Sequence, residues 1–300
     1  MSPKQEHQTT YKFLPNQLAE RLRKLGIAVK KQMDGGMTGL HRSPTFGSSV
    51  EFAEYRSYVP GDPIRRVDWA VYARTDRYMI RQFHDEVSVN SHVILDVSES
   101  MRYQQDGPMT KMDYACFLAA GFMYMMIQQG DTASLMTFDR KIRDRHEPAG
   151  SLSGLRPMLR ALEEIGPSEP GDIEQSLHDA AELIPGRALV VIISDLLQEP
   201  AEVLRGIGHL LHDGKDVTVF HVLDHGEIHL PMKGVFDIKF LENAPKMMVD
   251  IAQVRDAYLD RVRRYLDQLR AGCTNQGADY FLFDPKTDVR DALLKRSVRQ

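Results

Sequence analysis

The sequence predicts an α/β fold with a doubly wound, mainly parallel sheet covered by helices on both faces. A small irregular region of β and helical structure precedes it. Three observations carry this prediction. Strand-like and helix-like segments alternate from residue 87 onward. Residues 188–194 (ALVVIIS) are apolar without interruption, which is typical of a parallel strand buried on both faces. The chain of 300 residues, 42% of them hydrophobic, is also long enough to bury a large core.

The first 86 residues predict the irregular N-terminal region. Residues 12–31 place leucines at helical spacing with basic side chains opposite, and this basic face either lies in solvent or meets an acidic partner. Residues 34–50 are rich in Gly, Ser and Thr and indicate a loop. Residues 50–86 contain short aromatic and β-branched runs, interrupted by the turn sequence PGDP, and predict a small β region.

The remaining residues, 87–300, predict one α/β domain. Short β-branched runs mark its strands, and apolar residues three or four apart mark its helices. In chain order we expect a strand at 93–95, a helix at 112–129, a hairpin at 132–138 and 141–147, helices at 153–165 and 173–184, the strand at 188–194, a helix at 200–213, a strand at 217–223, a hairpin-like stretch at 226–249, a long helix from 251, a strand at 280–283 and a short terminal helix. We therefore divide the chain into residues 1–86 and 87–300.

Composition excludes several classes of protein. The two cysteines, Cys116 and Cys273, are too few for a disulfide framework and indicate a reducing compartment. The most apolar stretch, residues 114–127, is shorter than the roughly 20 residues that span a bilayer. The N-terminus lacks the apolar core of a signal peptide. We therefore expect a cytoplasmic protein without an integral membrane segment.

Charge is unevenly distributed along the chain. Residues 1–50 contain eight Lys and Arg against three Asp and Glu, and the other residues contain 30 against 39. The two parts therefore carry +5 and −9, which sum to the overall −4. A nucleic-acid-binding protein is usually predominantly basic, so this polarity favours docking to another protein and no nucleic acid.

Acidic and hydroxyl side chains follow two of the predicted strands. The first strand runs into DVSES, which places Asp96, Ser98 and Ser100 at alternate positions of one loop. The strand at 188–194 runs into Asp195. Because ligands bind beyond the carboxyl ends of parallel strands, we expect these oxygens to converge. Such oxygens are the ligands that Mg²⁺ prefers, so the pattern predicts a magnesium site. Alternatively, an aspartate after a strand only caps the next helix.

At these residues the chain resembles the von Willebrand factor A domain, whose metal-ion-dependent adhesion site begins with D-x-S-x-S. The segment 39–86 resembles more narrowly the bacterial family called "domain of unknown function 58". The residues that carry this resemblance are Glu51-Phe52, Arg56, Tyr58, Pro60-Gly61-Asp62, Arg65, Asp68-Trp69 and Ala73-Arg74. The similarity continues through the rest of the chain, over residues 35–298.

The resemblance implies a von Willebrand factor A-like domain that acts as a non-catalytic interaction module. Members of the family commonly accompany MoxR-type AAA+ ATPases, so we expect such a partner and an adaptor role in chaperone-like assembly or maturation. By the same resemblance, Asp96, Ser98, Ser100 and, through water, Asp195 would hold Mg²⁺. An Asp or Glu of the partner would complete the coordination.

One position departs from the pattern of the adhesion site. That site normally takes a threonine from a loop before a helix, and here Gly171 stands at this position in EPGDIEQSL. We expect the lost hydroxyl to weaken Mg²⁺ binding or to leave a vestigial site. Asp172 either fills the open corner or is only the N-cap of the next helix, with Gln175 as its capping-box partner.

The N-terminal region has a pattern of its own. Arginines alternate with Asp and Glu over residues 51–81, which favours internal ion pairs. Trp69 is the only tryptophan of the chain. We expect it to be buried with its N–H bonded to a carbonyl, and the alternative is an exposed interface anchor.

Signals for an enzyme are weak. The sequence contains no P-loop motif and no H-E-x-x-H. The alternative function is a metal-dependent phosphohydrolase that uses the same strand-end aspartates. That chemistry needs a second carboxylate two residues after the first, and this position is Ser98. We therefore expect a protein without catalytic activity.

Overall fold

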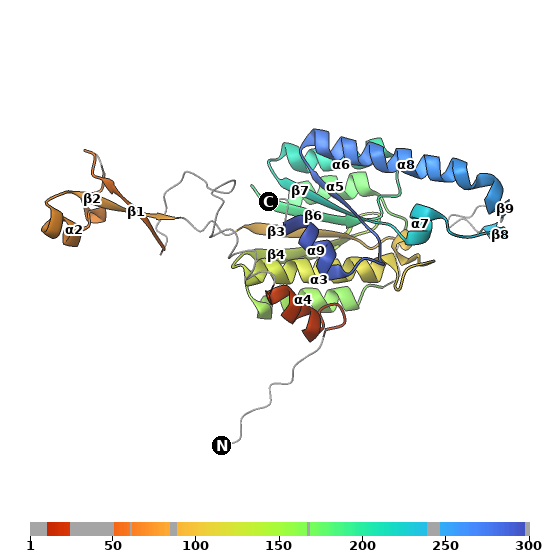
Figure 1. The fold of residues 1–300 in the computed structure, drawn as a ribbon, viewed down its shortest axis with the longest axis horizontal. Coiled ribbons are helices and arrows are strands. Elements are labelled where there is room, and N and C mark those ends of the chain that lie inside the picture. The colour runs from red at the N-terminus through yellow and green to blue at the C-terminus, as the bar shows by residue number, and fades with distance from the viewer. Residues whose placement is uncertain are drawn as a thin grey trace, which may run out of the picture. The chain divides into compact units, whose positions relative to one another are not determined.

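The computed structural model describes residues 11–24, 51–60, 62–84, 89–166, 169–238 and 247–297. The chain divides into two compact units (Figure 1). The larger one comprises Met1–Gly35 and Val89–Gln300, and we call it the α/β unit. The smaller one, Gly36–Ser88, is called the front unit.

Six strands form the central sheet of the α/β unit. Their order is β10-β7-β6-β3-β4-β5, in which β4 and β5 pair antiparallel and all other neighbours pair parallel. The strands are β3 (Asn90–Asp96), β4 (Thr132–Phe138), β5 (Ile142–Ala149), β6 (Leu189–Ser194), β7 (Asp216–Val222) and β10 (Asp279–Phe283). The predicted fold class is confirmed, and so is the hairpin formed by β4 and β5.

Helices cover both faces of this sheet, as Figure 1 shows. One layer consists of the helical residues 16–24, α3 (Lys111–Gln128), α4 (Leu152–Glu163) and α9 (Val289–Ser297). The other consists of α5 (Ile173–Leu183), α6 (Pro200–His212) and α8 (Ile251–Gln276). Successive residues of β3 alternate between the two cores, because side chains of a strand point to opposite faces in turn. Val93 and Leu95 belong to the first core and Ile94 to the second.

The central helix α3 is buried on most of its surface, as its apolar sequence predicts. Gly121 lies where two segments cross this helix. A Cβ at this position would lie 2.7 Å from Cδ1 of Leu293 in α9 and 3.2 Å from Cδ1 of Leu22. The missing side chain therefore lets both segments approach α3 closely. In the described part of the chain, neither α3 nor any other helix is long and apolar enough to cross a membrane.

The N-terminal segment packs within the α/β unit. Phe13 and Leu22 are buried in the same core as α3, and the Lys12 ammonium lies 2.8 Å from the Asp113 carboxylate. The predicted division placed this segment with the rest of residues 1–86. That boundary is corrected, because the apolar side of the segment is buried against α3. The predicted start of the domain at residue 87 lies close to Val89.

The front unit contains a two-stranded antiparallel ribbon and a short helix. The strands β1 (Glu51–Ser57) and β2 (Met79–His84) pair with each other. A single 3-10 turn, η1 (Ile64–Arg66), and the helix α2 (Trp69–Thr75) lie between them in the chain. The small β region that the sequence predicts is therefore present.

Two carboxylates organise the front unit. Asp62 accepts two hydrogen bonds from the Arg56 guanidinium, at 2.7 and 2.6 Å, which is one of the ion pairs that the alternating charges predict. Asp68 is buried and caps α2 by accepting two backbone N–H groups of its first turn. Trp69, the next residue, is 55% exposed. The expectation of a buried indole is wrong, and the buried side chain at the start of α2 is that of Asp68.

The strand order creates a crevice at the carboxyl ends of β3 and β6. From β3 the chain passes to β4 and β5 on one side, and it then returns to β6 on the other side of β3. Ligands of open α/β sheets bind at such a reversal of strand order. Between β7 and α8 the chain forms α7 (His225–His229) and a small hairpin of β8 (Val235–Ile238) and β9 (Met247–Asp250).

Candidate functional site at the carboxyl ends of β3 and β6

Asp96 is the last residue of β3 and lies in this crevice. It is 5% exposed, and its carboxylate accepts two hydrogen bonds. The backbone N–H of Ser98 donates to Oδ1 at 2.8 Å, and the hydroxyl of Ser194 donates to Oδ2 at 2.6 Å. Burial, together with the nearby carboxylate of Asp195, raises the pKa of Asp96 to about 6. Asp96 is therefore held in one orientation, in a place where its negative charge is unfavourable without a nearby cation.

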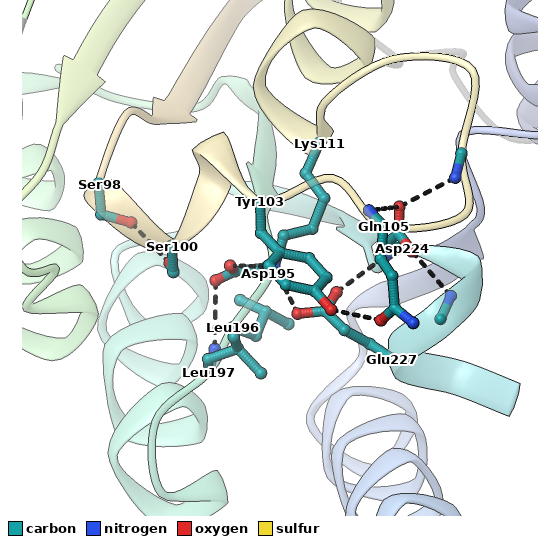
Figure 2. A network of polar contacts seen from close by, with 12 residues as sticks. Ser98, Ser100, Tyr103, Gln105, Lys111, Asp195, Leu196, Leu197, Asp224 and Glu227 are labelled. Atoms are coloured by element: carbon teal, nitrogen blue, oxygen red, sulfur yellow. Dashed lines mark hydrogen bonds and ion pairs between the residues drawn. The ribbon is translucent and has the colours of Figure 1, made fainter. Parts of the chain in front are cut away.

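The two predicted serines converge beside Asp96. Ser98 immediately precedes the short helix η2 (Glu99–Arg102), and its Oγ lies 3.1 Å from Oγ of Ser100 (Figure 2). Two oxygens at neighbouring corners of a Mg²⁺ octahedron, each about 2.1 Å from the ion, lie about 3 Å apart. The spacing of the two hydroxyls therefore fits a shared cation as well as a hydrogen bond between them.

Gly171 lies at the site, as the sequence predicts for the missing threonine. A Cβ built on Gly171 would lie 3.3 Å from Cβ of Ser98 and 3.5 Å from its Oγ. Asp172 points elsewhere, because its side chain accepts the backbone N–H of Gln175 and caps α5. The side chain of Gln175 donates to Asp179 at 2.7 Å. Asp172 is therefore an N-cap, which is one of the two roles left open by the sequence.

Asp195, the fourth predicted residue, follows β6 and is already paired with a cation. Its Oδ2 lies 2.7 Å from Nζ of Lys111, and the same ammonium lies 2.8 Å from Oε1 of Glu227 in α7. Figure 2 shows the side chain of Lys111 extending from the start of α3 toward these two carboxylates. The side chain of Lys111 is 0% exposed. The chain itself therefore provides positive charge beside the predicted metal ligand.

Lys111 and Glu227 are functional candidates that the sequence interpretation missed. Burial lowers the pKa of Lys111, but Asp195 and Glu227 more than offset this effect, so the pKa lies above its ordinary value. Burial raises the pKa of Glu227, and Lys111 opposes that rise. A lysine in the first turn of an apolar helix is a signal in the sequence, because the helix dipole disfavours a cation there unless carboxylates face it.

Gln198 ties together the two loops that border the site. Its Oε1 accepts the N–H of Ile173 at 2.9 Å, and its Nε2 donates to the carbonyl of Gly171. Tyr265 of α8 in turn donates to the carbonyl of Gln198 at 3.0 Å. The loop after β6 and the loop before α5 are therefore fixed to each other. No spacing in the sequence indicates this role of Gln198.

A pocket of about 180 Å³ opens between these loops. Its lining includes all four predicted site residues, together with Gly171, Ser194 and Gln198. Pockets for small-molecule ligands measure about 300–1,000 Å³, so this one suits an ion with its waters or a single side chain. A larger cavity of about 1030 Å³ lies along β10, α8 and α9 and is lined by none of the predicted site residues.

Comparison with known proteins identifies relatives of the chain. The family model described as "Protein of unknown function DUF58" matches residues 54–267. The uncharacterized protein Rv1480 of Mycobacterium tuberculosis is 28% identical over 221 residues, which cover 72% of this chain and 68% of that protein.

Two solved structures are similar to the chain. An aerotolerance-related membrane protein from Bacteroides fragilis has a TM-score of 0.50 and 17% identity, over 71% of this chain and 100% of that chain. The SpRpn10 VWA domain has a TM-score of 0.40 and 12% identity, over 70% of this chain and 95% of that chain. With the D-x-S-x-S loop at the end of β3 and a family match over more than half of its length, the chain belongs to the DUF58 family, and its α/β unit is von Willebrand factor A-like.

Proposed function

We propose that this protein is a non-catalytic, cytoplasmic interaction module that acts as an adaptor of a MoxR-type AAA+ ATPase in chaperone-like assembly or maturation. A von Willebrand factor A-like fold is typical of protein-interaction modules. The observation that carries the proposal is the pocket of about 180 Å³ that gathers Asp96, Ser98 and Ser100 at the strand ends. This volume suits one carboxylate side chain of a partner together with an ion, and it is small for a substrate.

The donor set of the pocket fits Mg²⁺. Asp96, Ser98 and Ser100 would hold the ion, with Asp195 reached through water. When bound, Mg²⁺ would supply an electrophilic position for an Asp or Glu of the partner. The 3.1 Å spacing of the serine hydroxyls supports this fit, and so does the burial of Asp96, whose charge is stabilised by a nearby cation. The water-linked role suits Asp195, because Lys111 occupies one side of its carboxylate.

Residues of the chain itself orient this pocket. Two hydrogen-bond donors hold Asp96, and Lys111 holds Asp195. Gln198 keeps the loop after β6 against Gly171. Because Gly171 offers no hydroxyl, one corner of the coordination is left to water or to the partner. The pocket is therefore preorganised by the protein and completed from outside.

The alternative of a phosphohydrolase has less support. Its acid and base would have to be the residue two positions after Asp96, and the hydroxyl of Ser98 does not titrate near neutral pH. The check is hydrolysis of a generic phosphate ester in Mg²⁺. Robust turnover that is abolished in Asp96→Asn would overturn the non-catalytic assignment.

The test of the proposal is capture of the purified MoxR-type ATPase of the source cells by the full chain, in Mg²⁺ and in EDTA. We expect capture in Mg²⁺ to be lost in EDTA and in Asp96→Ala. Asp256→Ala, a matched change at an exposed Asp of α8, should capture as wild type does. Thermal melting followed by circular dichroism checks that both variants are folded. Equal capture in Mg²⁺ and EDTA would contradict the metal-bridged contact, and no capture by wild type would contradict the choice of partner.

A further inference from the structure

The front unit presents a row of aromatic rings at its surface. Trp69 is 55% exposed and Tyr78 is 50% exposed. The indole of Trp69 meets the ring of Tyr72 edge-on, with centroids 6.1 Å apart. Tyr72 stacks on Tyr78 at 4.4 Å and 18°, and the ring of Tyr78 lies 6.3 Å from that of Tyr58. We call these four residues the aromatic row.

The helix that carries Trp69 and Tyr72 lacks a buried face. None of the seven residues of α2 is buried. Asp68 caps its N-terminus and Asp76, in the left-handed conformation, ends it, but caps satisfy backbone groups and bury no apolar area. A helix of fewer than about 12 residues is marginal in water and depends on packing of an apolar face. An exposed Trp on such a helix, together with the exposed Tyr78 that stacks on Tyr72, is typical of a surface that another molecule completes.

The exposed charged side chains that the structure describes in the front unit are mostly arginines. The carboxylate of Asp62 is engaged by Arg56, and that of Asp68 by the first turn of α2 and by the hydroxyl of Tyr55. Among the residues of this unit whose exposure is described, the charged side chains that are exposed are Arg65, Arg74, Asp76 and Arg77. Of these described and exposed side chains, three are guanidinium groups and one is a carboxylate, so together they favour a negatively charged partner.

We propose that the aromatic row and these arginines form a second docking surface, which binds an acidic protein surface with an apolar pocket for the indole of Trp69. Trp, Tyr and Arg are the residues that dominate binding energy in protein interfaces. Charge complementarity selects an acidic partner and excludes a basic one. The identification of that partner as the MoxR-type ATPase rests on the proposed function. The new element is a second contact with it, made by the front unit.

The geometry of the rings favours a protein over a single-stranded nucleic acid. Bases stack on free aromatic faces, whereas Tyr72 and Tyr78 each cover a face of the other and their hydroxyls lie 3.3 Å apart. The chain as a whole carries a net charge of −4, which is unlike the basic composition of nucleic-acid-binding domains.

Fluorescence of the only tryptophan gives a direct test, because it reports this surface alone. In the free full-length chain we expect the emission of a solvent-exposed indole that acrylamide quenches at every protein concentration. Addition of the purified ATPase, with the signal of the ATPase alone subtracted, should shift the emission of Trp69 to shorter wavelength and protect it from acrylamide. Both effects should decrease as salt is added, since the arginine contacts are screened.

Affinity measurements identify the residues that make the contact. We expect Trp69→Ala to weaken binding of fluorescently labelled ATPase by about 30-fold, the effect of a typical interface hot spot. Trp69→Phe keeps an aromatic ring and should retain most of the affinity. Arg74→Glu should weaken binding by about 10-fold. The matched control Arg156→Glu, at an exposed position of α4, should leave the affinity unchanged. Far-UV circular dichroism verifies the fold of each variant.

Every other outcome overturns the proposal. The emission of a buried indole in the free chain would show that the chain itself covers the row. A shift that grows with the concentration of the chain alone would assign the row to a second copy, and a shift caused by a single-stranded oligonucleotide and not by the ATPase would assign it to nucleic acid. ATPase binding that requires Asp96 and Mg²⁺ but leaves Trp69 exposed would refute this surface and leave the proposed function standing. No ATPase binding at all would refute both.

Discussion

Replacement of Lys111 by methionine tests the ion pairs that organise the candidate site. The ammonium is 0% exposed and lies 2.7 Å from Asp195 and 2.8 Å from Glu227, whose side chains are 2% and 18% exposed. Methionine keeps most of the side-chain volume but leaves two carboxylates without their cation. Removal of one partner from a buried ion pair typically costs about 3–5 kcal/mol. We therefore expect the free energy of unfolding of the α/β unit to fall by about 4 kcal/mol in Lys111→Met.

Two further variants separate the cost of leaving the two carboxylates without a cation from the cost of losing their hydrogen bonds to Lys111. The triple variant Lys111→Met, Asp195→Asn, Glu227→Gln removes the carboxylate charges together with the ammonium, so it should recover most of the lost stability. The matched control is Lys12→Met. Its ammonium also lies 2.8 Å from a carboxylate, that of Asp113, but the Lys12 side chain is 61% exposed, and the loss should be below about 1 kcal/mol.

Urea denaturation followed by far-UV circular dichroism is the assay, because the single tryptophan lies in the front unit and does not report the α/β unit. A loss in Lys111→Met no larger than that in Lys12→Met would refute the reasoning. A triple variant that is no more stable than Lys111→Met would refute it as well.

Three further predictions concern positions outside this ion-pair cluster. Gly171→Thr places a hydroxyl beside Ser98 and should tighten Mg²⁺ binding about 10-fold in titration calorimetry. Gly171→Val has the same shape without the hydroxyl and should not tighten it. Equal Mg²⁺ affinities of these two variants would show that residue 171 does not coordinate the ion. Burial lowers the pKa of His92 to about 4. The stability that neutral His92 contributes is therefore complete above pH 6.5 and is lost as the pH falls from 6.5 toward 4. The loss is at most about 3 kcal/mol, and it is smaller where solvent screens the charge. Urea unfolding of His92→Gln should therefore depend less on pH over this range than that of wild type, and identical profiles would contradict the assignment. Gly121→Ala should lower the free energy of unfolding by about 1 kcal/mol or more, because the clash with α9 outweighs the gain in helix propensity. The control is Gly150→Ala, whose Cβ would meet no atom nearer than 3.6 Å. Equal stability of the two variants would show that α9 moves away from α3 at little cost in free energy.

Much of the α/β unit and of its site could be predicted from local patterns. An uninterrupted apolar run predicts a strand buried on both faces, as β6 is. Parallel strands end at the same edge of a sheet, so Asp96 and Asp195 could be assigned to one site although they are far apart in the sequence. Ser98 and Ser100 could be assigned to the same pocket because one short loop carries them together with Asp96.

Features that depend on long-range packing could not be predicted in this way. Lys111 and Glu227 are 116 residues apart, and their contact depends on how α3 and α7 meet at the crevice. The N-terminal helical residues look like part of a separate region in sequence, yet their apolar stripe fits the space left by Gly121. The exposure of Trp69 was also missed, because a lone tryptophan favours a buried indole and the sequence does not show that α2 has no buried face.

The measurement that tests the central claim most directly is the dissociation constant of the full chain and the purified ATPase, determined over a series of Mg²⁺ concentrations for wild type, Asp96→Ala and the control Asp256→Ala. We predict an affinity that rises with Mg²⁺ in wild type and in Asp256→Ala and that does not respond to Mg²⁺ in Asp96→Ala. An affinity of wild type that is independent of Mg²⁺, or a response to Mg²⁺ that survives in Asp96→Ala, would contradict docking through the pocket at the ends of β3 and β6.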